Sequence, residues 1–150
     1  MIKLIVFDLD GVLVEAKNIH FDALNNALGT EYEISWAEHL STYDGLKTNQ
    51  KLDMLSEQKG LPTELHKQVW DKKQKYTLQM LKELKPNQTL QSVMNALSED
   101  GYKLAVCSNS IRKTVLTVLS KLGIMEFMDL IISNEDVKNS KPHPEMYWKA

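Results

Sequence analysis

Several features that mark particular classes of protein are scarce or missing from this sequence. A single cysteine, Cys107, cannot form an internal disulfide framework. No apolar run is long enough to span a bilayer, and Asp8 and Asp10 interrupt the only N-terminal candidate for a signal peptide. The net charge of −2 gives no reason to expect binding to nucleic acid or to anionic membranes. We therefore expect a cytoplasmic protein with no nucleic-acid partner and no membrane partner.

Strand-like and helical segments are distributed unevenly along the 150 residues. Short apolar runs that are typical of buried strands occupy 3–7, 102–107 and 130–132. Between the first and second runs, residues 15–85 carry only helical periodicity, and from residue 86 helices and strands alternate. Such alternation predicts a parallel α/β sheet. We expect one α/β core, formed by residues 1–14 and 86–150, with residues 15–85 as a helical insertion.

Local signals in the insertion predict where its helices begin and end. Ser35 and Glu38 have the spacing of a capping box. Thr48 is a candidate N-terminal cap for the next helix, and Pro86 is expected to follow the end of the last one. These signals predict that the insertion is a helical unit with no strand that could join the sheet.

The first strand runs directly into Asp8-Leu9-Asp10-Gly11, the most informative stretch of the chain. Burying carboxylates is costly unless they meet a cation or a full set of donors. Open α/β sheets bind ligands at the carboxyl ends of their strands. In extended chain Asp8 and Asp10 point to the same side, and Gly11 allows a sharp turn out of the sheet. These residues predict a metal or phosphate site, with an ordinary turn as the alternative.

Polar residues also follow the second and third strands. Ser108 and Asn109 could bind an anion together with the N–H groups that open the next helix, or could merely cap that helix. Lys141 follows the third strand within Lys141-Pro142-His143-Pro144-Glu145. A lone lysine is normally solvated, but flanking prolines restrict the backbone here. Lys141 is therefore a candidate to approach Asp8.

Three segments, 3–15, 102–112 and 133–147, resemble motifs of the haloacid dehalogenase-like hydrolase superfamily. The resemblance is to its capped phosphatase and beta-phosphoglucomutase-like branch. It implies a Rossmann-like parallel sheet, with residues 15–85 as a helical cap domain. It also implies a Mg²⁺-dependent phosphohydrolase that acts on a small phosphorylated metabolite.

The resemblance further implies a role for each motif residue. Asp8 is the expected nucleophile that forms an aspartyl-phosphate, and Asp10 is the expected general acid and base. Lys141 is expected to neutralise charge on the nucleophile and the phosphate. The Asp8 side chain and the Asp10 carbonyl are the expected ligands of Mg²⁺. Dehalogenases do not keep the second aspartate, so Asp10 favours phosphoryl transfer over dehalogenation. The expected phosphate-binding residues are Ser108, Asn109 and Gly11.

Two residues of the insertion are further candidates for substrate binding. Lys47 lies in a loop, Gly45-Leu46-Lys47, that resembles the one that capped sugar-phosphate enzymes point into their site. A solvated loop lysine is an equally good explanation. His20 occupies a position where relatives often carry a histidine at the base of the cap. A packing or capping role is the alternative for His20.

The sequence departs from the superfamily pattern after Lys141. The fourth motif, an acidic pair after a further strand, has no counterpart there, and Glu135 and Asp136 read as a turn. We expect a core that is truncated at its C-terminus and has an open sheet edge, which would permit self-association. Two alternatives to the phosphohydrolase therefore stay open. One is a catalytically incomplete protein that binds phosphate ligands or a partner chain, and the other is a sugar phosphomutase.

Overall fold

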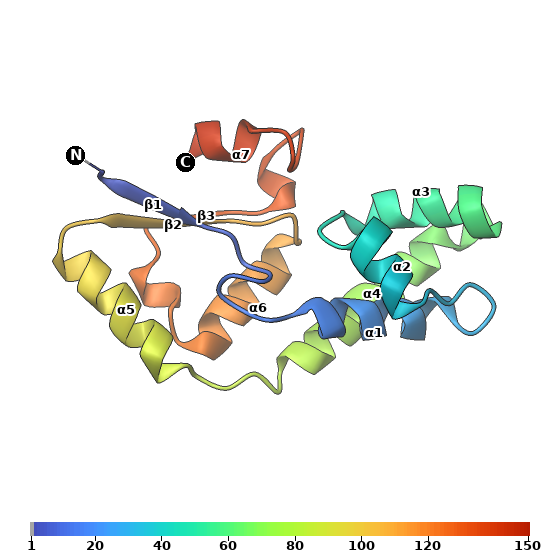
Figure 1. Cartoon of the computed structure of the whole chain (residues 1–150), viewed down its shortest axis with the longest axis horizontal. Coiled ribbons are helices and arrows are strands. Elements are labelled where there is room, and N and C mark those ends of the chain that lie inside the picture. Colours follow the sequence, from blue (N-terminus) through green and yellow to red (C-terminus); the bar gives the residue numbers. More distant parts are fainter. Residues whose placement is uncertain (1) are drawn as a thin grey trace. The chain divides into compact units, whose positions relative to one another are not determined.

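The computed structural model describes residues 2–150, which divide into two compact units (Figure 1). Unit 1 comprises the residues up to Glu15 together with Leu81–Ala150. Unit 2 comprises Ala16–Met80. No helix within the described residues is long and apolar enough to cross a membrane.

Unit 1 is built on a parallel three-stranded sheet with the order β1-β2-β3. The strands are β1 (Leu4–Phe7), β2 (Lys103–Cys107) and β3 (Leu130–Ile132). Phe7 pairs with Val106, and Cys107 pairs with Ile132. The three strands therefore end next to one another at one edge of the sheet. This arrangement confirms the predicted parallel α/β architecture.

Helices cover both faces of this sheet (Figure 1). They are α5 (Gln88–Glu99) and α6 (Arg112–Leu122) on one face and α7 (Glu145–Lys149) on the other. Short 3₁₀ turns occupy η3 (Met125–Phe127) and η4 (Asn134–Asp136). Met146 of α7 is fully buried against Cys107 and Ile132. Leu104 and Val106, also fully buried, point to the opposite face because side chains alternate along a strand.

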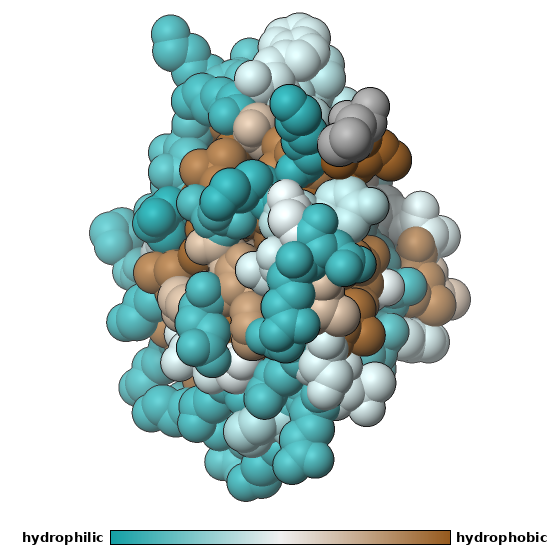
Figure 2. Space-filling model, turned by 90° about the vertical axis from the view of Figure 1, so that its left-hand side faces the viewer, coloured by the Kyte–Doolittle hydropathy of each residue, from teal (hydrophilic) through white to brown (hydrophobic). Residues whose placement is uncertain are grey.

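The surface of unit 1 mixes polar and apolar residues. Figure 2 faces the side of Figure 1 on which β1 and α5 lie, and hydrophobic residues reach the surface there in small patches between hydrophilic ones. The exposed apolar side chains of unit 1 include Val12, Val93 and Trp148. Scattered exposed apolar residues of this kind are normal for a globular protein.

All regular elements of unit 2 are helical. They are α1 (Lys17–Leu28), α2 (Trp36–Glu38), the π-helical turn η1 (His39–Tyr43), α3 (Thr48–Lys59), the 3₁₀ turn η2 (Thr63–Leu65) and α4 (His66–Leu81), whose last residue belongs to unit 1. The apolar stripes of these helices form one core, in which Leu24, Tyr43, Leu52 and Leu55 are almost completely buried. Burial of these stripes, rather than helix propensity alone, stabilises helices of this length.

Two local predictions in unit 2 had different outcomes. The capping box is confirmed, because the Glu38 N–H donates to Ser35 Oγ and the Ser35 N–H donates to Glu38 Oε2. The predicted cap at Thr48 is wrong by one residue, since Lys47 occupies the cap position and Thr48 is the first helical residue. The Thr48 hydroxyl instead accepts a hydrogen bond from Gln74 Nε2 at 3.2 Å. A tertiary contact has thus taken the place of the local one.

Candidate active site

The loop after β1 is tighter than the sequence suggested. The strand ends at Phe7, and the Leu9 carbonyl accepts the N–H of Leu13 at 2.9 Å, so the chain turns immediately. Gly11 adopts a φ of 80°, a conformation that glycine reaches without steric cost. Strand β1 therefore ends just before the two aspartates, and Asp10 forms an isolated bridge with Val14. That the Asp8 and Asp10 side chains point to the same side stays a prediction.

Asp8 and Lys141 meet although they are 133 residues apart in the sequence. The Lys141 ammonium donates to Asp8 Oδ1 at 2.8 Å and to the Cys107 carbonyl at 2.7 Å. The N–H of Leu9 also donates to Asp8 Oδ1, at 2.8 Å. The ring centroid of Tyr147 lies 5.6 Å from the ammonium, within the range of a cation–π contact. The Lys141 side chain is 17% exposed and that of Asp8 is 45% exposed. The ammonium of this ion pair is therefore mostly shielded from solvent, whereas the carboxylate is about half accessible.

Asp10 lies in the same loop and is approached from the end of β2. The Ser110 hydroxyl donates to Asp10 Oδ2 at 3.4 Å. Ser108 is fully buried, and its Oγ accepts the N–H of Ser110 at 3.0 Å. Ser110 was not among the site residues predicted from the sequence. Its position two residues after Ser108 was the available signal.

Asn109 turns its side-chain amide toward the backbone of Lys141. Its Nδ2 donates to the Lys141 carbonyl and its Oδ1 accepts the Lys141 N–H, both at 3.0 Å. The predicted contact of Asn109 with phosphate stays a prediction. The observed contact joins the loop after β2 to the lysine segment.

The acidic residues ahead of Lys141 hold their own loop in place. Glu135 accepts the Arg112 N–H at 2.6 Å, at the start of α6. Asp136 accepts the N–H and hydroxyl of Ser133, and it also pairs with the Arg112 guanidinium at 3.1 Å. The Ser133 hydrogen bonds, together with Arg112, hold the pKa of Asp136 below its usual value. Both acids therefore stabilise the turn in which they lie.

His20 and Lys47 belong to unit 2, and each is described within that unit. His20 lies on α1, where its Nδ1 is 3.5 Å from the Lys73 ammonium. Lys47 precedes α3, and its N–H donates to Gln50 Oε1 at 3.2 Å. Their predicted role in substrate binding stays a prediction.

Unit 2 also contains two buried lysines that the sequence analysis missed. Lys51 is only 4% exposed and Lys73 only 6%. Lys51 is one helical turn from Leu55, and Lys73 is one turn from Val69, so both lie on apolar helix faces. This spacing was a signal that could have identified them.

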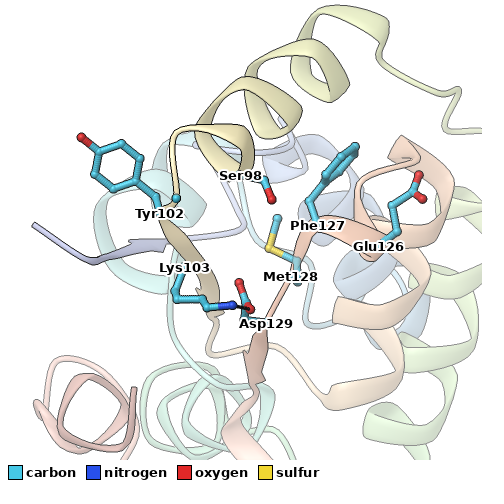
Figure 3. A pocket seen from close by; sticks show the side chains of 8 residues that line it. Ser98, Tyr102, Lys103, Glu126, Phe127, Met128 and Asp129 are labelled. Carbon is cyan, nitrogen blue, oxygen red and sulfur yellow. Dashed lines mark hydrogen bonds and ion pairs between the residues drawn. The ribbon is translucent and has the colours of Figure 1, made fainter.

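A separate pocket of about 180 Å³ lies at the other end of the sheet (Figure 3). Lys103 begins β2, whereas Asp8 follows the end of the parallel strand β1. Within the pocket the Lys103 ammonium points at Asp129 and lies 2.8 Å from its Oδ1. Asp129 also accepts the Leu104 N–H, and these contacts, led by that with Lys103, lower the pKa of Asp129. Lys103 and Asp129 thus compensate one another's charge in this pocket, which Glu126 also lines.

Asp8 and Asp10 are the carboxylates available for a metal ion at the active-site edge. Within residues 2–150 no group of three or more His, Cys, Asp or Glu side chains is placed to hold a metal. Mg²⁺ is commonly held by one or two carboxylates, with water and substrate phosphate completing its shell. The oxygen donors of this loop therefore fit a hard divalent cation that binds together with a phosphorylated ligand.

Comparison with known sequences identifies the family. A family profile described as "Haloacid dehalogenase-like hydrolase" matches residues 5–150. The chain belongs to this family. The hydrolase is 26% identical over 147 residues to the phosphorylated carbohydrates phosphatase of Thermotoga maritima, which covers 95% of the chain and 66% of that relative. It is 26% identical over 159 residues to the pyrophosphatase PpaX of Bacillus cereus, covering 99% of the chain and 67% of that relative.

Solved structures agree with this assignment. The beta-phosphoglucomutase of Clostridium difficile matches with a TM-score of 0.85 and 26% identity, covering 99% of the chain and 69% of that structure. CbbY of Rhodobacter sphaeroides, in complex with phosphate, matches with a TM-score of 0.83 and 26% identity, covering 100% and 71%. The haloacid dehalogenase-like hydrolase thus falls among phosphatases and phosphomutases, which generally use a divalent metal. The chain spans about two thirds of the length of the curated relatives that it matches.

Proposed function

We propose that this haloacid dehalogenase-like hydrolase is a Mg²⁺-dependent phosphohydrolase that acts on a small phosphorylated metabolite. The observation that carries the proposal is the 2.8 Å contact between the Lys141 ammonium and the half-exposed Asp8 carboxylate, with Asp10 in the same loop. Two of the similar proteins support a small phosphorylated metabolite as the substrate class. One is a phosphorylated carbohydrates phosphatase, and the other is CbbY in complex with xylulose-(1,5)bisphosphate.

In the proposed reaction the Asp8 carboxylate attacks phosphorus, and the bond to the leaving oxygen breaks. Asp10 donates a proton to that oxygen and later takes one from the water that hydrolyses the aspartyl-phosphate. Lys141 stabilises the negative charge that the phosphoryl group carries in the transition state. A bound Mg²⁺, held by Asp8 and the Asp10 carbonyl, would reduce the repulsion between carboxylate and phosphate.

The remaining residue assignments are also proposals. Ser108 and Gly11 are proposed to contact the phosphoryl group. Unit 2 is proposed to be the helical cap domain of the family, with His20 and Lys47 as residues that recognise the substrate. A location in the cytoplasm also stays a prediction.

The experiment is hydrolysis of para-nitrophenyl phosphate with and without MgCl₂. Asp8→Asn is expected to lower kcat by about 10³-fold or more, because an amide cannot act as the nucleophile. Asp100→Asn is the matched control, since Asp100 is exposed at the end of α5. Removal of Mg²⁺ by a chelator is expected to abolish turnover reversibly.

A folded wild-type protein without turnover on aryl and sugar phosphates would contradict the proposal and favour a phosphate-binding protein. The structural similarity to beta-phosphoglucomutase supports phosphomutase activity as a second candidate. Product analysis separates the two reactions. A phosphatase releases inorganic phosphate from a sugar phosphate, whereas a mutase forms an isomeric sugar phosphate.

A further inference from the structure

The Asn109 amide connects two loops that the sheet itself does not join. Backbone pairing between β2 and β3 extends to the Ser108 N–H, which donates to the Ile132 carbonyl at 2.9 Å. Beyond this point Asn109 Nδ2 donates to the Lys141 carbonyl and Asn109 Oδ1 accepts the Lys141 N–H. A side-chain amide offers the same donor and acceptor as a peptide group. Asn109 therefore supplies a sheet-like pair of hydrogen bonds where backbone pairing has ended.

Asn109 is itself anchored by the loop that follows β3. Asn134 Nδ2 donates to the Asn109 carbonyl at 2.8 Å, and the Asn134 N–H donates to the Ser110 carbonyl at 3.2 Å. The Asn109 backbone is thus held independently of Lys141. A held backbone allows its amide to orient the lysine segment.

Lys141 requires such an anchor because its side chain has several rotatable bonds. Its ammonium must reach Asp8 Oδ1 and the Cys107 carbonyl together. Those two contacts hold the tip of the side chain, and the Asn109 amide holds the backbone from which it starts. Both ends of the lysine are therefore restrained.

We propose that Asn109 is a positioning residue that orients Lys141 toward Asp8, an inference that rests on the proposed phosphohydrolase function. In this proposal Asn109 acts on the reaction through Lys141, and direct contact with the phosphate is the alternative. Small displacements of a catalytic group lower the rate by up to about 10²-fold. Asn109→Ala is therefore expected to lower kcat by about 10- to 100-fold and to change KM by less than about threefold.

A double-mutant cycle with Lys141→Met tests this route. Para-nitrophenyl phosphate with MgCl₂ is the substrate. If Asn109 acts only through Lys141, adding Asn109→Ala to Lys141→Met changes kcat by less than about twofold. Additive losses in the double variant would overturn the proposal. So would a raised KM with unchanged kcat, which indicates direct substrate binding, or an Asn109→Ala variant as active as the wild type.

Asn109→Asp and Asn87→Ala complete the design. The aspartate keeps the shape of asparagine and the acceptor for the Lys141 N–H, but it loses the donor to the Lys141 carbonyl. Asn109→Asp should therefore show the same loss of kcat, and it replaces Asn109→Ala if that variant does not fold. Asn87 is exposed and caps α5 by accepting the Leu90 N–H. Its replacement by alanine lowers the unfolding temperature without affecting kcat. If Asn87→Ala lost as much kcat as Asn109→Ala, the loss in Asn109→Ala would be explained by general destabilisation of the fold. That result would overturn the proposal.

A readout that needs no turnover separates this inference from the proposed function. The Cε and Nζ NMR signals of Lys141, assigned with Lys141→Arg, should shift when Asp8→Asn removes the neighbouring charge. That response should be lost in the Asn109→Ala background. Inactivity of the wild type together with this loss would refute the phosphohydrolase and retain Asn109 as a positioning residue. An unchanged response would refute the positioning role.

Discussion

His39 of unit 2 makes the stability of the hydrolase depend on pH. The side chain is fully buried, and its ring is stacked on Trp36 with a centroid distance of 5.3 Å. Neither ring nitrogen has a hydrogen-bond partner within the described residues. Asp44 Oδ1 lies 3.9 Å from His39 Nε2, beyond hydrogen-bond distance. Burial, assisted by the positive charges of Lys51 and His20 and opposed by Asp44 and the Lys17 backbone, lowers the pKa of His39.

The sign of the effect follows from proton linkage. The pKa of His39 is lower in the folded chain than the value of about 6.5 expected when unfolded, so the unfolded state binds more protons below that pH. The free energy of unfolding should therefore fall as the pH drops below about 6.5, and level off below the folded pKa. One histidine contributes at most about 1.4 kcal/mol per pH unit. Because the unfolded histidine is only half protonated at pH 6.5, the loss from His39 between pH 6.5 and 5.5 is up to about 1 kcal/mol.

His39→Phe isolates this contribution because it keeps an aromatic ring beside Trp36 and removes both unpaired nitrogens. We expect the pH-dependent loss to disappear and the free energy of unfolding at pH 7 to rise by about 1 kcal/mol. Urea unfolding followed by tryptophan fluorescence at pH 5.5, 6.5 and 7.5 measures both effects.

The control is Asn87→Ala, which removes no ionisable group and should lower the free energy of unfolding by the same amount at all three pH values. Glu38 does not interfere in this range. Its hydrogen bonds, first of all from the Ser35 backbone, lower its pKa to about 2, so the stability linked to it is lost only below about pH 4.5. Parallel pH profiles of the wild type and His39→Phe would refute this reasoning.

Two further predictions concern packing and capping. Met146→Ala should lower the free energy of unfolding by about 2–5 kcal/mol because the side chain is fully buried between α7 and the sheet. Val93→Ala, at a half-exposed position of α5, should change it by less than about 0.5 kcal/mol, and equal losses in urea unfolding would contradict the assigned core. Ser35→Ala should cost about 0.5–2 kcal/mol because the capping box is lost, whereas Ser41→Ala, at an exposed serine, should be nearly neutral. A stable Ser35→Ala variant would show that the box does not stabilise unit 2.

Local sequence signals were sufficient to predict most of the helices and strands. The three apolar runs became strands β1, β2 and β3, because strand formation follows short, strongly apolar segments in an α/β pattern. Ser35 and Glu38 formed their box because the interacting atoms are only three residues apart. Thr48 failed as a cap because a competing tertiary partner, Gln74, was not visible locally.

The motifs indicated which residues of unit 1 were candidates, but their contacts depended on the register of the sheet. Pairing of Phe7 with Val106 and of Cys107 with Ile132 places the three strand ends together, which lets Lys141 reach Asp8. The sequence also did not show which atoms the polar side chains of these motifs would contact.

By itself, then, the sequence determined the α/β class, the helical character of residues 15–85 and the family, since these depend on apolar spacing and short motifs. Only the tertiary structure decided that the Asn109 amide meets the Lys141 backbone and that Ser110 approaches Asp10. A hydrogen bond between residues distant in sequence forms only after the chain between them has folded. Its partners are therefore chosen by sheet register and loop closure, and not by neighbouring residues.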